Sequence, residues 1–245
     1  MHATEFYKNR LSFHERKLYA AISAAWSTAS PTCEVNPLLR GGAIRRTIEA
    51  VTLDNPGLFA VDPHAYTMQT RFCFIPLHRM LFHPLYSPQE AERLGRELRL
   101  WQRKVCVQLP PYAAASAQKA WMLMDYLART VRYGGGERAE AHTIVGAARG
   151  EAVCSGLAKA YKFLCDGAGV PCIVASGTLS EGSSSISHAW NIVEIDGRCL
   201  HIDLTSQLDE AHQRGKASAA FLHGDAALVR AGYTWNREVL PPCPD

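Results

Sequence analysis

The sequence predicts an α+β protein whose first half is mainly helical and whose second half combines helices with antiparallel strands. Two helix starts, Ser12–Glu15 and Ser87–Glu90, have the capping-box pattern, in which a serine and a later glutamate satisfy free N–H groups of the first turn. Three strand-like runs follow residue 170. The last two flank Asp196–Gly197, a dipeptide that is favoured in tight hairpin turns.

The composition is that of a folded protein rather than of a disordered chain. Hydrophobic residues make up 47% and charged residues 20% of the 245 positions, and a chain of this length buries a core without disulfide support. The net charge of only +3 and the lack of long basic runs argue against nucleic-acid binding. No apolar stretch reaches the roughly 20 residues that span a bilayer, so we expect no membrane association.

The N-terminus and the eight cysteines bear on the cellular compartment. Charged residues interrupt the stretch Met1–Lys17, where a secretory signal would be continuously apolar. Cys165 and Cys172 lie inside apolar runs, and the cysteine spacings are irregular, which favours free thiols in a reducing compartment. We therefore expect a cytoplasmic protein, although a secreted protein without its signal peptide would look the same.

Caps, chain breaks and periodicity predict the elements of the first half. Beyond the helix that starts at Ser12, helices are expected at Ala43–Val51 and from Ser87 to about Val107, with an irregular stretch and possible strands in Leu58–Pro84. The prolines of Leu109–Pro111 interrupt the helical pattern. We place a boundary there, between an N-terminal helical region, residues 1–110, and a core, residues 111–245.

The second half is predicted to hold two further helices and the strands. Apolar residues at helical spacing predict helices from Ser116 to about Tyr133 and from Glu151 to Asp166, each followed by glycines that end it. The strands are expected at residues 171–176, 188–195 and 198–204, with the serine-rich stretch 180–187 as a mobile loop.

Cys154 lies at the predicted start of the second of these helices, which is a position that activates a thiol. A cysteine attacks a carbonyl as the thiolate, and the positive end of a helix dipole lowers the thiol pKa. The backbone N–H of Cys154 has no acceptor within the first helical turn. It is therefore free to serve as one donor of an oxyanion hole.

Hairpin pairing brings a histidine and a carboxylate to one face of the predicted sheet. Counting outward from the two-residue turn pairs Trp190 with Asp203, which makes His188 a diagonal neighbour of that aspartate about 7 to 8 Å away. A carboxylate bonded to one imidazole nitrogen fixes the ring and leaves the other nitrogen for a thiol. The opposite face is mostly apolar, so we expect one face to be core and the other to hold polar chemistry.

Three segments resemble the motifs of the transglutaminase-like superfamily: Gly150–Ala158, His188–Asn191 and His201–Thr205. The resemblance spans roughly residues 112–210. It implies a papain-like α+β core in which the helix that bears the cysteine packs on an antiparallel sheet. It assigns Cys154 as the nucleophile, His188 as the general base and acid, and Asp203 as the residue that orients the imidazole. Segments outside this core look like those of stand-alone bacterial relatives.

The resemblance leaves the second oxyanion donor open. Members of the family often use a tryptophan or glutamine side chain in that role, and Gln118 and Trp121 are the candidates in this sequence. Such cores also often have an aspartate directly after the tyrosine that ends the preceding helix, whereas Gly134 follows Tyr133 here.

We expect Ser155 and Gly156, which follow the nucleophile, to bind substrate together with Trp190, which forms a wall of the cleft or part of the core. His201 is expected to be a partly exposed hairpin residue. A zinc site is the structural alternative for the group Cys165, Cys172, Cys199 and His201. These cysteines lack the short Cys-x-x-Cys spacing typical of structural zinc, so no metal and no cofactor are expected.

The predicted function is thiol-dependent acyl transfer on peptide or glutamine-type amides by Cys154, His188 and Asp203. Water as the acceptor gives a protease or amidase, and an amine gives a transglutaminase; the sequence leaves both open. The alternative is a catalytically silent module that keeps the fold and binds peptides. The expected partner is a peptide or protein substrate, and the oligomeric state is left open.

Overall fold

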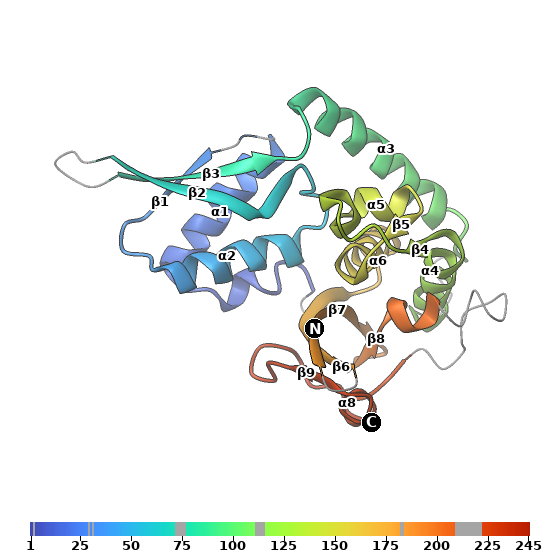
Figure 1. Ribbon diagram of the computed structural model, residues 1–245. Coiled ribbons are helices and arrows are strands. Elements are labelled where there is room, and N and C mark those ends of the chain that lie inside the picture. Colours follow the sequence, from blue (N-terminus) through green and yellow to red (C-terminus); the bar gives the residue numbers. More distant parts are fainter. Residues whose placement is uncertain are drawn as a thin grey trace. The chain divides into compact units, whose positions relative to one another are not determined.

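The computed structural model describes residues 1, 3–28, 30, 32–71, 77–110, 116–181, 184–208 and 222–245, and the chain divides into two compact units (Figure 1). One unit is residues 4–97, and the other is residues 98–245 together with residues 1–3. The division falls within helix α3, Pro88–Cys106, because the second half of this helix packs on the core. There the Trp101 Nε1–H donates to the Tyr126 hydroxyl at 2.9 Å. The boundary predicted from the sequence lies instead just after this helix.

The N-terminal unit combines helices with a small sheet. Its elements are η1 (Lys8–Arg10), α1 (Phe13–Ser27), β1 (Thr32–Val35), α2 (Gly41–Asp54), β2 (Val61–Arg71) and β3 (Leu77–Pro84). The capping box at Ser12 is present, and the antiparallel strand order is β1-β3-β2. Ile22 and Trp26 of α1 share a buried cluster with Met80 of β3. The region is thus not only helical, because the possible strands in Leu58–Pro84 form a real sheet.

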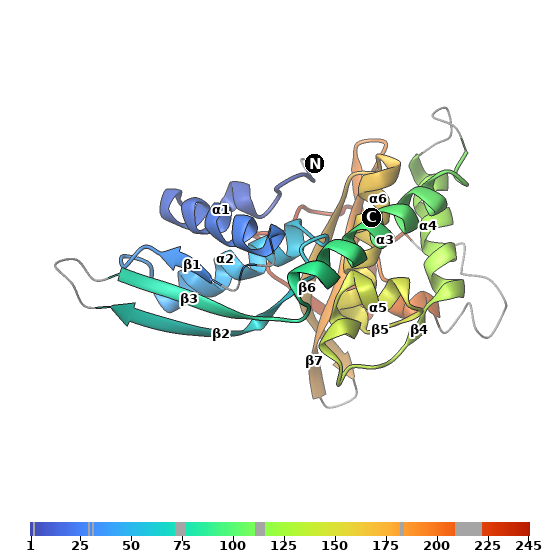
Figure 2. The same cartoon turned by 90° about the horizontal axis from the view of Figure 1, so that it is seen from above.

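The core unit is a four-stranded antiparallel sheet with a helix packed on it. Its elements are α4 (Ser116–Thr130), β4 (Arg132–Tyr133), η2 (Ala139–His142), α5 (Ile144–Ala148), β5 (Glu151–Ala152), α6 (Cys154–Ala168), β6 (Cys172–Glu181), β7 (Ser184–Ile195), β8 (Arg198–Ile202), α8 (Asp225–Arg230) and β9 (Tyr233–Trp235). The strand order is β8-β7-β6-β9, and both views show α6 lying along β6 and β7 (Figures 1 and 2). This arrangement confirms the predicted α+β fold.

The hairpin turn forms as predicted, but the pairing ends earlier. Asp196 and Gly197 both have left-handed φ values, 51° and 79°, and Ile195 pairs with Arg198. β8 stops at Ile202, and residues 204–208 are helical. The predicted strand pairing of Trp190 with Asp203 is therefore wrong, because the chain turns into a helix where the strand was expected to continue.

Two other expectations about this sheet are wrong. Most of the serine-rich stretch 180–187 belongs to the strands β6 and β7 rather than to a loop, while residues 182–183 lie outside the described part of the chain. Polar side chains suit such a hairpin because its pairing uses only backbone groups. The expected polar face is also largely buried, since Trp190, Ile192 and His201 are at most 1% exposed. Both faces of this sheet are therefore packed.

The helix expected to run to about Tyr133 ends at Thr130, and Tyr133 lies in β4. β4 pairs in parallel with β5, just before α6. None of the described helices combines the length and the hydrophobicity that crossing a bilayer would require.

Candidate functional site

Cys154 is the first residue of α6, as the sequence predicted. Val153 is the N-cap, with an extended backbone, and its N–H donates to the Ala141 carbonyl at 3.1 Å. This bond anchors the entry of the helix to the segment before α5. The half-buried thiol therefore lies at the positive end of the helix dipole, where a thiolate is stabilised.

The side chain of His188 links the thiol of Cys154 to the carboxylate of Asp203. Its Nε2–H donates to Asp203 Oδ2 at 2.8 Å, and the imidazole also hydrogen-bonds the Cys154 thiol. Both the imidazole and the carboxylate are buried. The structure thus brings together the three residues that the sequence singled out, although Asp203 reaches His188 from beyond the end of β8.

The environment favours a thiolate–imidazolium pair. Burial opposes ionisation of Cys154, but hydrogen bonds from His188 and from the Ala189 backbone N–H lower the pKa of the thiol overall. Burial also opposes protonation of His188, but its hydrogen bonds to Asp203 and Cys154 raise the pKa of the imidazole to about 9. Both shifts favour the charged pair of thiolate and imidazolium over the neutral pair.

These pKa directions predict the pH dependence of the site. Alkylation of Cys154 by iodoacetamide should rise with pH through a midpoint below the ordinary thiol value of about 8.5, because the thiol ionises early. Acyl transfer should rise over the same range and then fall with an alkaline limb near pH 9, where His188 loses its proton. Alkylation rates and kcat/KM against pH measure both limbs. Alkylation that begins only above the ordinary thiol value would contradict the ion pair.

Asp203 accepts hydrogen bonds from three donors. His188 and the Tyr233 hydroxyl both donate to Oδ2, and the Thr205 backbone N–H donates to Oδ1 at 2.8 Å. The ring of Tyr233 also packs edge-on against His188, with 5.6 Å between ring centroids. Burial and the nearby carboxylate raise the pKa of Tyr233, so its hydroxyl keeps its proton and donates.

Sequence reasoning missed Tyr233. It lies in β9, which joins the sheet by pairing with β6, where Tyr233 is opposite Leu179. No local pattern near Tyr233 indicates this contact, because the pairing joins segments that are far apart in the sequence.

Tyr233→Phe is expected to lower kcat/KM about 10-fold, because a hydrogen bond to a charged group is lost. Without this donor the carboxylate interacts more strongly with the imidazolium, which raises the His188 pKa further and moves the alkaline limb to higher pH. Tyr161→Phe is the matched control, since it removes another buried hydroxyl, which donates to the Ala120 carbonyl at 2.9 Å. The control should lower the melting temperature without moving the limb. If the alkaline limb of the pH profile stays at the same pH in Tyr233→Phe, the role of Tyr233 is purely structural.

Trp190 packs against His188 and belongs to the core. Its ring stacks on the imidazole at a centroid distance of 6.1 Å, and its Nε1–H donates to His201 Nδ1 at 3.0 Å. His201 Nε2 in turn lies 2.9 Å from Asp225 Oδ1. The prediction of a partly exposed His201 is wrong, since the side chain is fully buried, and burial lowers its pKa.

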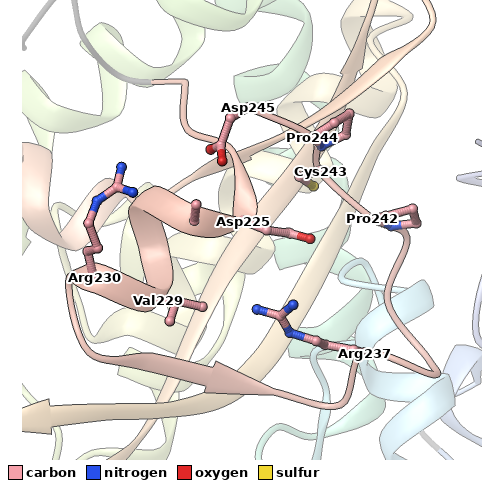
Figure 3. A pocket seen from close by; sticks show the side chains of 9 residues that line it. Asp225, Val229, Arg230, Arg237, Pro242, Cys243, Pro244 and Asp245 are labelled. Atoms are coloured by element: carbon pink, nitrogen blue, oxygen red, sulfur yellow. The ribbon is translucent and has the colours of Figure 1, made fainter.

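A second polar group lies beside this histidine. Ligand atoms of His201, Asp225 and Cys243 lie within 4.8 Å of one another. A pocket of about 600 Å³ adjoins them and is lined by Asp225, Val229, Arg230, Arg237, Cys243 and Asp245, among others (Figure 3). Figure 3 shows the Arg237 and Asp225 side chains on the same side of this pocket.

Hydrogen bonding accounts for this group without a metal. His201 Nδ1 accepts the Trp190 proton, so the ring carries its own proton on Nε2, the atom that faces Asp225. A metal would need a lone pair on that atom. Burial also raises the pKa of Cys243, which disfavours the thiolate that a metal binds. In the described part of the chain, the group of possible metal ligands contains His201 but not Cys165, Cys172 or Cys199, the cysteines of the zinc alternative.

The residues predicted to bind substrate lie in different environments. Ser155 is half-buried, and its Oγ lies 3.1 Å from His142 Nδ1. Gly156 is buried, and a Cβ there would lie 2.2 Å from the Ala141 carbonyl oxygen, so this position requires glycine for close helix packing. Trp190 is buried as described. Contact of any of the three with a substrate stays a prediction.

Part of the chain also matches a known protein family. Residues 103–204 match the family model of the transglutaminase-like superfamily. No curated protein matches the chain. A solved transglutaminase structure, "a TGase", is 12% identical over 56% of this chain and 43% of its own, with a TM-score of 0.34.

A candidate cysteine protease from Cytophaga hutchinsonii is 14% identical over 72% of this chain and 73% of its own, with a TM-score of 0.38. This chain spans less than half of the length of the transglutaminase structure. Structural similarities this low carry no statement about activity. The match to the family therefore rests on residues 103–204, the range that contains Cys154, His188 and Asp203.

Proposed function

Because residues 103–204 belong to the transglutaminase-like superfamily, a family of thiol-dependent enzymes, we propose that this protein transfers acyl groups through a triad of Cys154, His188 and Asp203. The contact of one imidazole with both the thiol and the carboxylate is the observation that carries the proposal. The lowered thiol pKa and the raised imidazole pKa support it further, because a peptide-binding module has no need of either.

The geometry allows a two-step reaction on an amide. The Cys154 thiolate attacks the carbonyl carbon, a C–S bond forms, and the C=O electron pair moves to the oxygen. When the C–N bond then breaks, His188 gives its proton to the departing amine. Water or a second amine next loses a proton to His188 and attacks the thioester, which releases the thiolate. Asp203 keeps the imidazole in place throughout.

The proposed substrates are peptide bonds or glutamine side-chain amides, and the proposed acceptors are water or a primary amine. Water leads to hydrolysis and an amine leads to crosslinking. Peptide, glutamine-donor and amine-acceptor libraries would distinguish them, with amine release and mass increase as the readouts. We expect turnover by the wild type and none by Cys154→Ala.

Cys106→Ala is the control for the effect of removing a thiol. Cys106 is also half-buried, but burial raises its pKa, and its Sγ lies 3.7 Å from the Leu164 carbonyl. This variant should turn over substrate at the wild-type rate. Iodoacetamide should label Cys154 first. Equal labelling of all accessible thiols, together with no turnover in any library, would favour the peptide-binding module and reject the enzyme.

A further inference from the structure

One edge of strand β7 is left without a neighbouring strand beside the histidine of the site. β6 pairs with β7 along residues 184–193 in an unbroken register, and the two strands lie side by side (Figure 2). On its other edge, here called the outer edge, β7 pairs with β8 only at residues 191–195. In the described part of the chain, no strand pairs with the outer edge at residues 184–190. That stretch includes His188 and the residues before it.

Backbone hydrogen bonds show which residues of β7 face the outer edge. In an antiparallel sheet, the N–H and C=O groups of successive residues point alternately to the two sides of the strand. The Glu194 N–H donates to the carbonyl of Pro171, the residue just before β6, at 2.9 Å. The even-numbered residues of β7 therefore face β6. Because the register is unbroken, the odd-numbered residues Ser185, Ser187 and Ala189 direct their backbone groups to the outer edge.

The outer edge leads to the reactive sulfur. The N–H of Ala189 points to this edge, and it is the group that hydrogen-bonds the Cys154 thiol. The next outward positions, Ser187 and Ser185, lie about 7 Å and 14 Å further along the strand, because a strand rises about 3.4 Å per residue. An extended peptide that pairs with these two serines is therefore led to Cys154.

The composition of the outer edge suits the binding of another strand. Proteins usually protect an exposed edge with charged side chains, proline or a bulge. Residues 184–187 contain no charged residue and no proline, and all four are exposed. The register with β6 has no bulge along this stretch. Within the described residues, the edge thus lacks the features that would prevent strand addition.

We propose that the main chain of the acyl donor binds as an added strand along the outer edge of β7, pairing with Ser187 and Ser185 while its reactive amide lies at Cys154. The inference rests on the proposed function and deepens it, because it names extended, unstructured peptide segments as the substrate class. Main-chain hydrogen bonds give affinity in this mode of recognition without a fixed side-chain sequence. Segments inside a folded helix or sheet would not bind, since their backbone groups are already paired.

N-methylation of a peptide tests this pairing without any change to the protein. The probe is the capped library peptide that binds Cys154→Ala most tightly, methylated at one backbone nitrogen at a time. Alternate N–H groups of an added strand face β7. Methylation at every second residue on one side of the reactive residue should therefore weaken binding about 10-fold, through loss of a hydrogen bond. Methylation at the residues between them should have little effect. Isothermal titration calorimetry measures the dissociation constants.

Ser185→Pro removes one outward N–H from the protein itself. Proline is tolerated at edge positions whose N–H lies outside the hydrogen-bonded ladder, and this position is three residues from His188. In the Cys154→Ala background, the change should weaken binding of the probe about 10-fold. With Cys154 present, alkylation by iodoacetamide should keep the wild-type rate, because this small reagent does not extend along the edge. Ser185→Ala is the matched control, since it removes the hydroxyl and keeps the N–H, and both values should stay unchanged.

The other outcomes overturn the inference. Methylation that is tolerated everywhere, or that weakens binding equally at neighbouring residues, would mean that the donor does not bind as a strand. Unchanged binding in Ser185→Pro would exclude this edge. A dimer in solution that dissociates in Ser185→Pro would mean that a second copy of the chain pairs there. If proline lowers the melting temperature, the methylation scan decides alone. Failure of the proposed function looks different, since the alternating pattern of binding would then remain without turnover by the wild type.

Discussion

Replacement of His188 by alanine is expected to lower the rate of acyl transfer by at least about 10⁴-fold while the protein stays folded. Without the imidazolium, burial dominates at Cys154, so the thiol pKa rises and little thiolate remains at neutral pH. The departing amine also loses its proton donor. The measurement is kcat/KM on a substrate from the library screen, together with the rate of alkylation by iodoacetamide at pH 7.

His142→Ala is the matched control for this substitution. The His142 ring also lies near the start of α6, but it hydrogen-bonds Ser155 Oγ and the Gly136 carbonyl, at 3.1 and 3.0 Å, instead of the thiol. Its loss should have a much smaller effect on both rates. Alkylation of His188→Ala at the wild-type rate would show that the imidazole does not activate Cys154, and the proposed triad would then fail.

Trp190→Ala is expected to destabilise the core unit by about 4 kcal/mol. The indole is 1% exposed and packs against His188, Tyr233 and Trp235, so its removal leaves a cavity in the sheet that carries the site. The substitution also takes away the N–H that His201 Nδ1 accepts. An unpaired buried acceptor adds its desolvation cost to that of the cavity. Urea denaturation followed by far-ultraviolet circular dichroism measures the loss.

Trp101→Ala provides the comparison, because its indole is only half-buried, stacks on Phe163 and donates to the Tyr126 hydroxyl. The Trp101 indole buries less apolar surface than the Trp190 indole, so its removal should lower the free energy of unfolding by clearly less. Equal losses in the two variants would mean that Trp190 is not packed as the structure shows. They would favour the other role considered from the sequence, in which the indole forms a wall of the substrate cleft.

The elements that could be predicted from the sequence are those specified by neighbouring residues. The Ser12 capping box, the Asp196–Gly197 turn and the place of Cys154 at a helix start each depend on a few consecutive side chains. The motif around His188 was equally readable, and its contact with Asp203 followed from hairpin geometry. That contact forms although the strand pairing assumed for it ends before Asp203, because the hydrogen bond requires only that the aspartate lie close to His188.

The parts that could not be predicted depend on long-range packing. His201 is buried because α8 and β9 pack against it. The residue pattern of β8 gives no sign of this packing, because both elements come later in the chain. The sequence predicts Tyr133 as the end of a helix, because nothing local distinguishes a final helical turn from a two-residue strand that pairs with β5. Tyr233 reaches Asp203 only through the pairing of β9 with β6.

The late position of β9 in the chain has a consequence for biosynthesis. A polypeptide emerging from the ribosome displays the cysteine of α6 about 80 residues before the strand whose tyrosine steadies the aspartate, and domains generally fold as the chain is made. Until then, Cys154 is present in the nascent protein while Asp203 lacks the hydrogen bond from Tyr233. The thiol is therefore expected to reach its full reactivity only after the final strand has docked, which limits unwanted modification of the nascent protein.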